Sequence, residues 1–348
     1  MAELTVFGGG SWGTALAAAA AAAGHSVQLW CRREEQAKAI NSLGRNPDYL
    51  KDIPLPSGLT ATADPKEAAL ASRLWILALP TQSLGEFLAG LGHFFTDGTE
   101  ICNVAKGIEI ETGRRISQIV GEILPQAPYS VLSGPSFASE VARGLPTAVT
   151  VASDRESSAL LWQSLLNSSR LRLYTSGDVT GTEIGGAVKN IIAIASGLAS
   201  SLGLGDNARA ALICRGLAEI QRMGGALGAH PLTLAGLAGM GDLVLTCYSV
   251  QSRNFRLGAA LGRGLSLEAA ISEVGEVAEG AYTVKAVIKE AERLSVDMPI
   301  SGGVGRLLYG GASAEEELTR LLSRTPKPEY PSWAFWQTGS CRGEKTDV

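Results

Sequence analysis

A glycine-rich turn near the start of the chain has the residue types and spacing to bind a diphosphate. Gly8, Gly10 and Gly13 form a GxGxxG pattern between an apolar run at residues 4–7 and an alanine-rich stretch that follows. The pattern allows a tight turn, a close approach to a pyrophosphate and helix–strand contact, and the positive end of the next helix attracts the anion. Among 42 glycines the pattern alone is weak, and a flexible loop is the alternative. Its position directly after an apolar run favours a dinucleotide fold.

Two arginines after the next apolar run bear on the choice of dinucleotide. Folds that prefer NAD usually carry an acidic residue there for the ribose hydroxyls, whereas this chain has Arg32 and Arg33. Guanidinium groups bind a 2′-phosphate and stack on adenine. We therefore expect NADP(H) to be preferred, with NAD(H) still possible because Glu34 and Glu35 follow closely. The alternative is that one or both arginines are solvated surface charges.

The elements that must position these residues alternate through the first half of the chain. Up to about residue 175, short apolar runs recur with helical or loop segments between them, which is typical of a parallel sheet with helices on both faces. We expect strands at residues 5–8, 27–31, 74–78, 100–104, 130–132 and 148–152. The predicted fold class is α/β, beginning with a Rossmann-type doubly wound sheet.

The second half has a different period. From about residue 182 the apolar residues recur almost wholly at helical spacing. We expect helices at residues 183–202, 207–228, 231–238, 253–263, 266–274, 280–294 and 299–323. The predicted parts are a NAD(P)-binding domain over residues 1–181, an all-helical substrate-binding domain over 182–324 and an irregular tail over 325–348.

Composition limits the classes of partner and site. The 348 residues suffice for two domains, and 45% hydrophobic with 18% charged residues is typical of a soluble globular protein. A net charge of −4 gives no reason to expect nucleic acid or an anionic membrane. The apolar run at residues 15–23 is too short to span a bilayer, so we expect no stable membrane insertion and a cytoplasmic location. The five scattered cysteines never form CxxC, so we expect neither a disulfide framework nor a metal site.

Six blocks of sequence, in chain order, resemble the bacterial NAD(P)-dependent glycerol-3-phosphate dehydrogenase family. They are GGGSWGTALA at 8–17, NVAKGIE at 103–109, SGPSFASEVARGLPTAV at 133–149, EIGGAVKNIIAIASGL at 183–198, GLAGMGDLVLTCYSVQSRNFRLG at 236–258 and GEVAEG at 275–280. The resemblance implies reversible reduction of dihydroxyacetone phosphate to sn-glycerol 3-phosphate, the entry step of glycerophospholipid synthesis. It also implies a helical domain of the 6-phosphogluconate dehydrogenase type and a homodimer.

Lys189 and Asp242 are the candidates for proton transfer. Lys189 lies among small and apolar residues of a predicted helix, where loss of water would lower the pKa of its ammonium and make it a better acid. The resemblance makes Lys189 the catalytic proton donor and acceptor and a substrate contact; a lysine that snorkels to solvent is the alternative. Asp242 follows two glycines and precedes an apolar run, so it is a candidate helix N-cap. By resemblance it also holds Lys189 or binds a substrate hydroxyl, and both roles can coexist.

The remaining site residues are assigned mainly by the resemblance. Ser252, Arg253 and Asn254 combine a hydroxyl, a guanidinium and an amide at a predicted helix start, a set suited to a phosphate ester. An exposed helix-start arginine is the alternative. Further substrate contacts are implied for Lys106, Gly134 and Ser136, although turn chemistry alone would explain the Gly-Pro pair. Cofactor contacts are implied for the glycine turn with Ser11 and Trp12, and for Lys106, Ala138, Arg253, Val277 and Glu279.

Two other functions remain open from the sequence. A related reductase that acts on 3-hydroxyacids or 6-phosphogluconate would share the fold and a lysine, but should lack the SRNFR and GMGDL blocks seen here. A protein that senses NADPH without catalysis would keep the glycine turn and the arginines, but would need neither Lys189 nor Asp242. The sequence leaves open the ratio of NADPH to NADH use, inhibition by product, the oligomeric state and the role of the tail.

Overall fold

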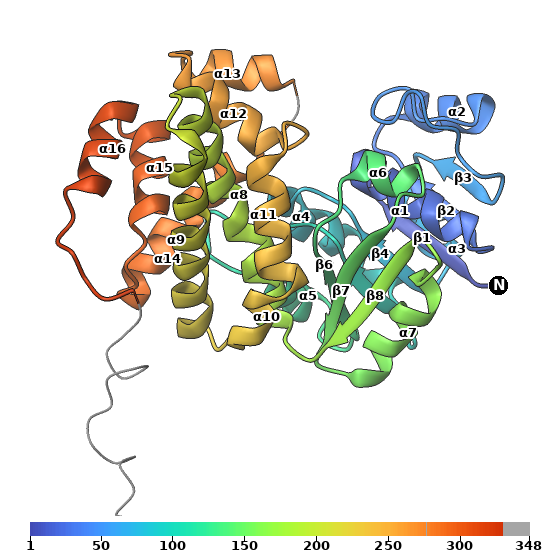
Figure 1. The fold of residues 1–348 in the computed structure, drawn as a ribbon. Coiled ribbons are helices and arrows are strands. Elements are labelled where there is room, and N and C mark those ends of the chain that lie inside the picture. The colour runs from blue at the N-terminus through green and yellow to red at the C-terminus, as the bar shows by residue number, and fades with distance from the viewer. Residues whose placement is uncertain (276, 330–348) are drawn as a thin grey trace, which may run out of the picture.

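The structure, a computed structural model, describes residues 1–275 and 277–329 and consists of two lobes. A sheet with flanking helices forms the N-terminal lobe, and a group of helices forms the C-terminal lobe (Figure 1). The predicted α/β class, a Rossmann-type sheet followed by an all-helical part, is confirmed.

One sheet of eight strands organises the N-terminal lobe. Its order is β3-β2-β1-β4-β5-β6-β7-β8. Neighbouring strands are parallel except for β6 and β7, which are antiparallel. The strands are β1 (Glu3–Phe7), β2 (Ser26–Trp30), β3 (Leu59–Thr62), β4 (Leu74–Leu77), β5 (Glu100–Asn103), β6 (Tyr129–Ser133), β7 (Thr147–Ser153) and β8 (Leu171–Ser176).

The two strands that the sequence prediction missed are the two edges of this sheet. The strand β3 has the sequence LTAT, and β8 has the sequence LRLYTS, in which exposed residues alternate with buried ones. Edge strands that face solvent do not need a continuous apolar run, whereas the central strands are buried on both faces. The continuous-run criterion therefore found only the central strands.

Helices cover both faces of the sheet. The first of them, α1, contains seven alanines, and most of its residues are buried because small side chains allow it to lie close to the strands. The helices are α1 (Ser11–Ala22), α2 (Glu34–Leu43), α3 (Pro65–Ala71), α4 (Thr81–Leu91), α5 (Ile116–Ile123), α6 (Ala138–Ala142) and α7 (Glu156–Leu166).

The C-terminal lobe is built around one long buried helix, α8, on which most of the other helices pack. The helices are α8 (Val179–Ser201), α9 (Gly205–Ala226), α10 (Pro231–Ala235), a π-helix (Leu237–Gly241), α11 (Asp242–Tyr248), α12 (Arg253–Gly262), α13 (Leu267–Val274), α14 (Glu279–Leu294), α15 (Pro299–Tyr309) and α16 (Ala314–Leu322).

Two helix predictions are wrong in their extent. The segment expected at 299–323 is two helices, because Gly311 takes a left-handed φ of 70° and Ser313 caps a new helix with its side chain. The segment expected at 231–238 stops at Ala235 and continues as a π-helix into α11. Asp242 is the first residue of α11, and the preceding Gly241 occupies the cap position. Asp242 is therefore not the N-cap residue.

Glycines set the distance between α8 and α12. A Cβ added to Gly258 would lie 1.9 Å from the carbonyl oxygen of Ile194, and one added to Gly197 would lie 1.9 Å from that of Phe255. Both values are far below any tolerated contact, so the two backbones touch directly. This contact holds the start of α12 beside the middle of α8, where Lys189 lies.

Two stretches are long and apolar enough to cross a membrane by length and composition, namely Val179–Ser201 and Pro231–Tyr248. The first is α8, and 78% of its most apolar window is buried inside the protein. Packing in the core accounts for its composition. The second stretch joins three short helical elements and is 39% buried over its window, and such a stretch alone is weak evidence of a membrane span.

Candidate functional site

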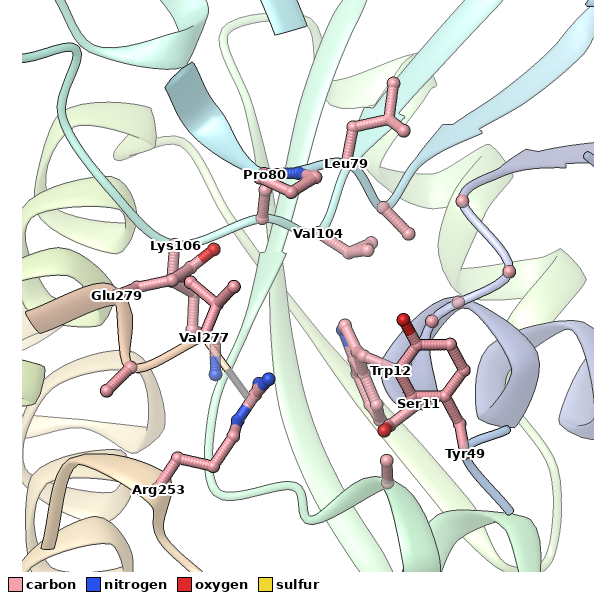
Figure 2. A pocket seen from close by; sticks show the side chains of 18 of the residues that line it. Ser11, Trp12, Tyr49, Leu79, Pro80, Val104, Lys106, Arg253, Val277 and Glu279 are labelled. Atoms are coloured by element: carbon pink, nitrogen blue, oxygen red, sulfur yellow. The ribbon is translucent and has the colours of Figure 1, made fainter. Parts of the chain in front are cut away.

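A cleft of about 1330 Å³ lies between the two lobes. Every residue predicted for the site lines it except Gly134. From the N-terminal lobe these are Gly8, Gly10, Ser11, Trp12, Gly13, Arg32, Arg33, Lys106, Ser136 and Ala138; from the C-terminal lobe they are Lys189, Asp242, Ser252, Arg253, Asn254, Val277 and Glu279. Figure 2 shows Ser11 and Trp12 on one wall and Lys106, Arg253, Val277 and Glu279 on the other.

Asp242 joins two lysines from different lobes. Its Oδ1 atom lies 2.6 Å from Nζ of Lys189, and its Oδ2 atom lies 2.6 Å from Nζ of Lys106. Lys189 also donates a hydrogen bond of 2.7 Å to Oγ1 of Thr246, one turn along α11. The carboxylate at the start of α11 thus fixes the ammonium groups of α8 and of the loop after β5 in one cluster.

The cluster shifts the pKa values of its members. Burial lowers the pKa of Lys189 to about 8, the Lys106 charge adds to this, and Asp242 opposes it. Burial disfavours the ionised form of Asp242, but the two adjacent ammonium groups outweigh that and lower its pKa. At neutral pH the centre therefore holds an ionised carboxylate and a lysine that can gain or lose a proton near the working pH.

Small residues make room for Lys106. A Cβ at Gly186 of α8 would lie 3.3 Å from Cγ of Lys106 and 2.9 Å from Oγ of Ser133, so a larger residue there would crowd the Lys106 side chain. Gly134, with φ at +149° and packed on Val149, turns its carbonyl to accept a hydrogen bond of 3.2 Å from Nζ of Lys106. Gly134 thus acts on the site through Lys106 rather than by lining the cleft.

The start of α12 presents three polar side chains. Ser252 caps the helix by accepting a hydrogen bond of 3.2 Å from the backbone N–H of Phe255. The amide of Asn254 bridges Asn190 of α8 and the backbone N–H of Gly280, at 3.0 and 2.9 Å. In Figure 2 the Arg253 side chain extends from this helix start into the cleft. The three residues therefore combine a helix N-terminus with a positive charge.

The chain matches the two family models described as the NAD-dependent glycerol-3-phosphate dehydrogenase N-terminus, over residues 3–159, and C-terminus, over residues 178–319. It is 48% identical over 328 residues to a glycerol-3-phosphate dehydrogenase [NAD(P)+] of Thioalkalivibrio sulfidiphilus, covering 94% of this chain and 98% of that protein. The chain belongs to this family. A crystal structure of glycerol-3-phosphate dehydrogenase from Coxiella burnetii superposes with a TM-score of 0.90 at 37% identity, covering 93% of this chain and 99% of that one.

Hydrogen bonds from two side chains hold the backbone of the glycine turn in this family member. The carbonyl of Gly9 accepts hydrogen bonds from Gln36, at 2.7 Å, and from Asn46, at 2.9 Å. A Cβ at Gly13 would lie 2.0 Å from the carbonyl oxygen of Gly8, whereas one at Gly10 would meet no described atom within 4 Å. Gly13 is thus needed for packing, and the open side of Gly10 leaves the backbone accessible from the cleft.

Donors suited to a dinucleotide surround this turn. Among the described residues, no side chain caps the first turn of α1, and Nε1 of Trp12 has no hydrogen-bond partner. Arg33 pairs with Asp48 at 2.6 Å, and both Arg32 and Arg33 line the cleft. These donors fit a diphosphate and a further phosphate on the ribose.

Several residues of the site were not found from the sequence. Thr246, Gln36 and Asn46 act by hydrogen bonds to residues distant in sequence, and no motif marks them. Tyr49 lines the same cleft as Ser11 and Trp12 and appears on the same side of Figure 2; it is a partly exposed aromatic ring, 42% accessible.

Over residues 1–275 and 277–329, no group of three His, Cys, Asp or Glu side chains could hold a metal ion. Cys31, Cys102, Cys214 and Cys247 are free thiols in the described part of the chain.

Proposed function

We propose that this chain reduces dihydroxyacetone phosphate reversibly to sn-glycerol 3-phosphate, with Lys189 as the proton donor. The observation that carries the proposal is the buried Lys189–Asp242–Lys106 cluster, which faces the same cleft as the glycine turn. The names of the relatives and the family match support the choice of substrate.

The proton step follows from the pKa of Lys189. A bound nicotinamide would supply or accept the hydride. With a pKa of about 8, Lys189 is mostly protonated at pH 7 and can donate from Nζ to the carbonyl oxygen. In the reverse direction its neutral form removes the hydroxyl proton. Asp242 and Thr246 hold Nζ in place in both directions.

The substrate phosphate is assigned to the start of α12. Arg253 supplies charge there, and Ser252 and Asn254 fix the helix N-terminus beside it. Lys106 adds positive charge near the carbonyl, while Gly134 and Ser136 shape the loop behind it.

The cofactor proposed is NADPH in preference to NADH. Arg32 and Arg33 follow the end of β2 and line the cleft, where their guanidinium groups would bind a 2′-phosphate. Asp48 already pairs with Arg33, and this ion pair reduces the attraction of Arg33 for the 2′-phosphate. NADH is therefore expected to remain a usable cofactor. Ser11, Trp12, Ala138, Val277 and Glu279 would complete the cofactor wall.

The location, the oligomeric state and the metabolic role are proposed on the same basis. We expect a cytoplasmic homodimer that supplies sn-glycerol 3-phosphate for glycerophospholipid synthesis, without stable membrane insertion. The division at residues 181 and 324 stays a prediction. Residues 330–348 of the predicted tail lie outside the described residues.

The test is the substrate-dependent loss of NADPH absorbance by purified wild type and Lys189→Ala. We expect turnover to fall roughly 100- to 10,000-fold in the variant, with NADPH affinity nearly unchanged. The control is Lys51→Ala, an exposed lysine outside the cleft. Near-normal turnover in Lys189→Ala would reject its role, and activity with hydroxyacids but not dihydroxyacetone phosphate would reject the substrate.

Arg253→Ala provides a separate test of the phosphate site. The variant should raise the Michaelis constant for dihydroxyacetone phosphate, because a charged hydrogen-bond donor to the ester is lost. An unchanged Michaelis constant would argue against the assignment.

A further inference from the structure

Arg256 is a cleft residue that the proposed reaction does not use. It lies on α12 three residues after Arg253, so the two arginines share one face of the helix, and both line the cleft. The Nε atom of Arg256 is buried and has no hydrogen-bond partner among the described residues. Buried donors in folded proteins are nearly always paired, so an unpaired donor on an arginine that lines the cleft raises the question of a ligand contact.

Arg209 offers a useful comparison, since its Nε is also buried without a partner in the described part of the chain. Its guanidinium stacks on the ring of Tyr248 at 4.5 Å and pairs with Asp206, and it does not line the cleft. Packing therefore accounts for Arg209. Arg256 has a comparable buried donor and an open cleft beside it.

The position of Arg256 along α12 separates it from the reacting centre. Asn254 contacts Asn190, Gly258 packs against Ile194, and Gly262 packs against Ser201. The two helices thus run in the same direction, and each step along α12 leads away from Lys189. Arg256 lies beyond the helix start that would bind the substrate phosphate.

The surroundings indicate an anion other than the substrate. The cleft that Arg256 lines is also lined by Ile271, Ser272 and Gly275 of the α13 region and, from the opposite lobe, by Arg32 and Arg33. We infer that Arg256 binds a phosphate group of the dinucleotide from the helical lobe. This inference rests on the proposed use of NADPH, and it makes the cofactor a bridge between the two lobes.

The experiment measures dissociation constants of NADPH and NADH by titration without substrate, for wild type, Arg256→Gln and Arg256→Lys. The control is Arg263→Gln, an exposed arginine after the same helix that pairs with Glu273 outside the cleft. Arg256→Gln should weaken NADPH binding by about tenfold or more, because a charged donor is lost, while the control binds as wild type. Arg256→Lys keeps the charge but not the planar fork and should fall between them.

The two dinucleotides then identify the phosphate. Equal weakening for NADPH and NADH assigns the diphosphate, and weakening confined to NADPH assigns the 2′-phosphate; either result supports the inference. Unchanged affinity for both overturns it, as does a raised Michaelis constant for dihydroxyacetone phosphate with unchanged dinucleotide affinity. Thermal unfolding reports whether Arg256→Gln folds, and Arg256→Lys serves if it does not.

The titration needs no turnover, so it separates this inference from the proposed function. If wild type binds NADPH but does not reduce dihydroxyacetone phosphate, the proposed function fails and the role of Arg256 can still be measured.

Discussion

Replacing Lys106 by methionine should raise the pKa of Lys189. The substitution keeps the aliphatic stem beside Gly186 and removes one positive charge. The positive charge of Lys106 is one of the causes that lower the pKa of Lys189 to about 8. Its removal therefore stabilises the protonated form of Lys189. The substitution is therefore expected to shift the pKa of Lys189 upward.

The geometry gives the size of the shift. The two Nζ atoms each lie 2.6 Å from opposite oxygens of Asp242, so one carboxylate separates the two charges. Two like charges on the order of 6 Å apart repel by about 3 kcal/mol at an effective dielectric constant of about 20, or about two pKa units. The Lys106 side chain is 16% exposed, and solvent screens part of this. We expect an upward shift of about one unit or more.

The assay is the pH dependence of kcat/KM for dihydroxyacetone phosphate from about pH 6 to about pH 10, which reports the free enzyme. Reduction needs protonated Lys189, so in wild type the rate should fall as the pH rises through about 8. In Lys106→Met the same fall should occur at higher pH, on a lower plateau. Lys51→Met should leave the wild-type profile unchanged. An unshifted or acid-shifted profile in Lys106→Met would refute the electrostatic coupling.

Three further predictions test cofactor choice and packing. The double variant Arg32→Gln with Arg33→Gln should raise the Michaelis constant for NADPH about tenfold or more and change that for NADH little, as parallel kinetics with both cofactors would reveal. Glu183→Gln should destabilise the protein by about 3 kcal/mol in urea unfolding, because this buried carboxylate accepts four hydrogen bonds; an unchanged midpoint would contradict this. Gly258→Ala should cost at least about 2 kcal/mol by the same measurement, since its Cβ would overlap the carbonyl of Ile194; a stable variant would disprove the close crossing.

The central strands and the glycine turn were predictable because each depends on a local pattern. β1 and β4 are buried over most of their length and are mainly apolar, and the glycines of the turn are needed by backbone geometry within six residues. The edge strands β3 and β8 contain exposed residues between buried ones, so they lack a continuous apolar run.

The site residues, too, were predictable where local sequence blocks mark them and were not predictable where contacts between distant residues decide. Lys189, Arg253 and Asp242 were found because they stand in long blocks typical of the family. The cap predicted for Asp242 was wrong, because a π-helix leads directly into α11 and leaves Gly241 at the cap position. The carboxylate of Asp242 binds two lysines, 53 and 136 residues away, of which the family resemblance indicated only Lys189.

The sequence by itself determined the fold class, the family and the residue types available for catalysis, since these follow from local periodicity and from blocks of neighbouring residues. Only the tertiary structure decided how strongly Lys189 is desolvated, that Lys106 shares its carboxylate and that Arg256 lines the cleft with an Nε that no described residue pairs. Burial and charge interaction act through space, and they are fixed only when both lobes are packed on one another.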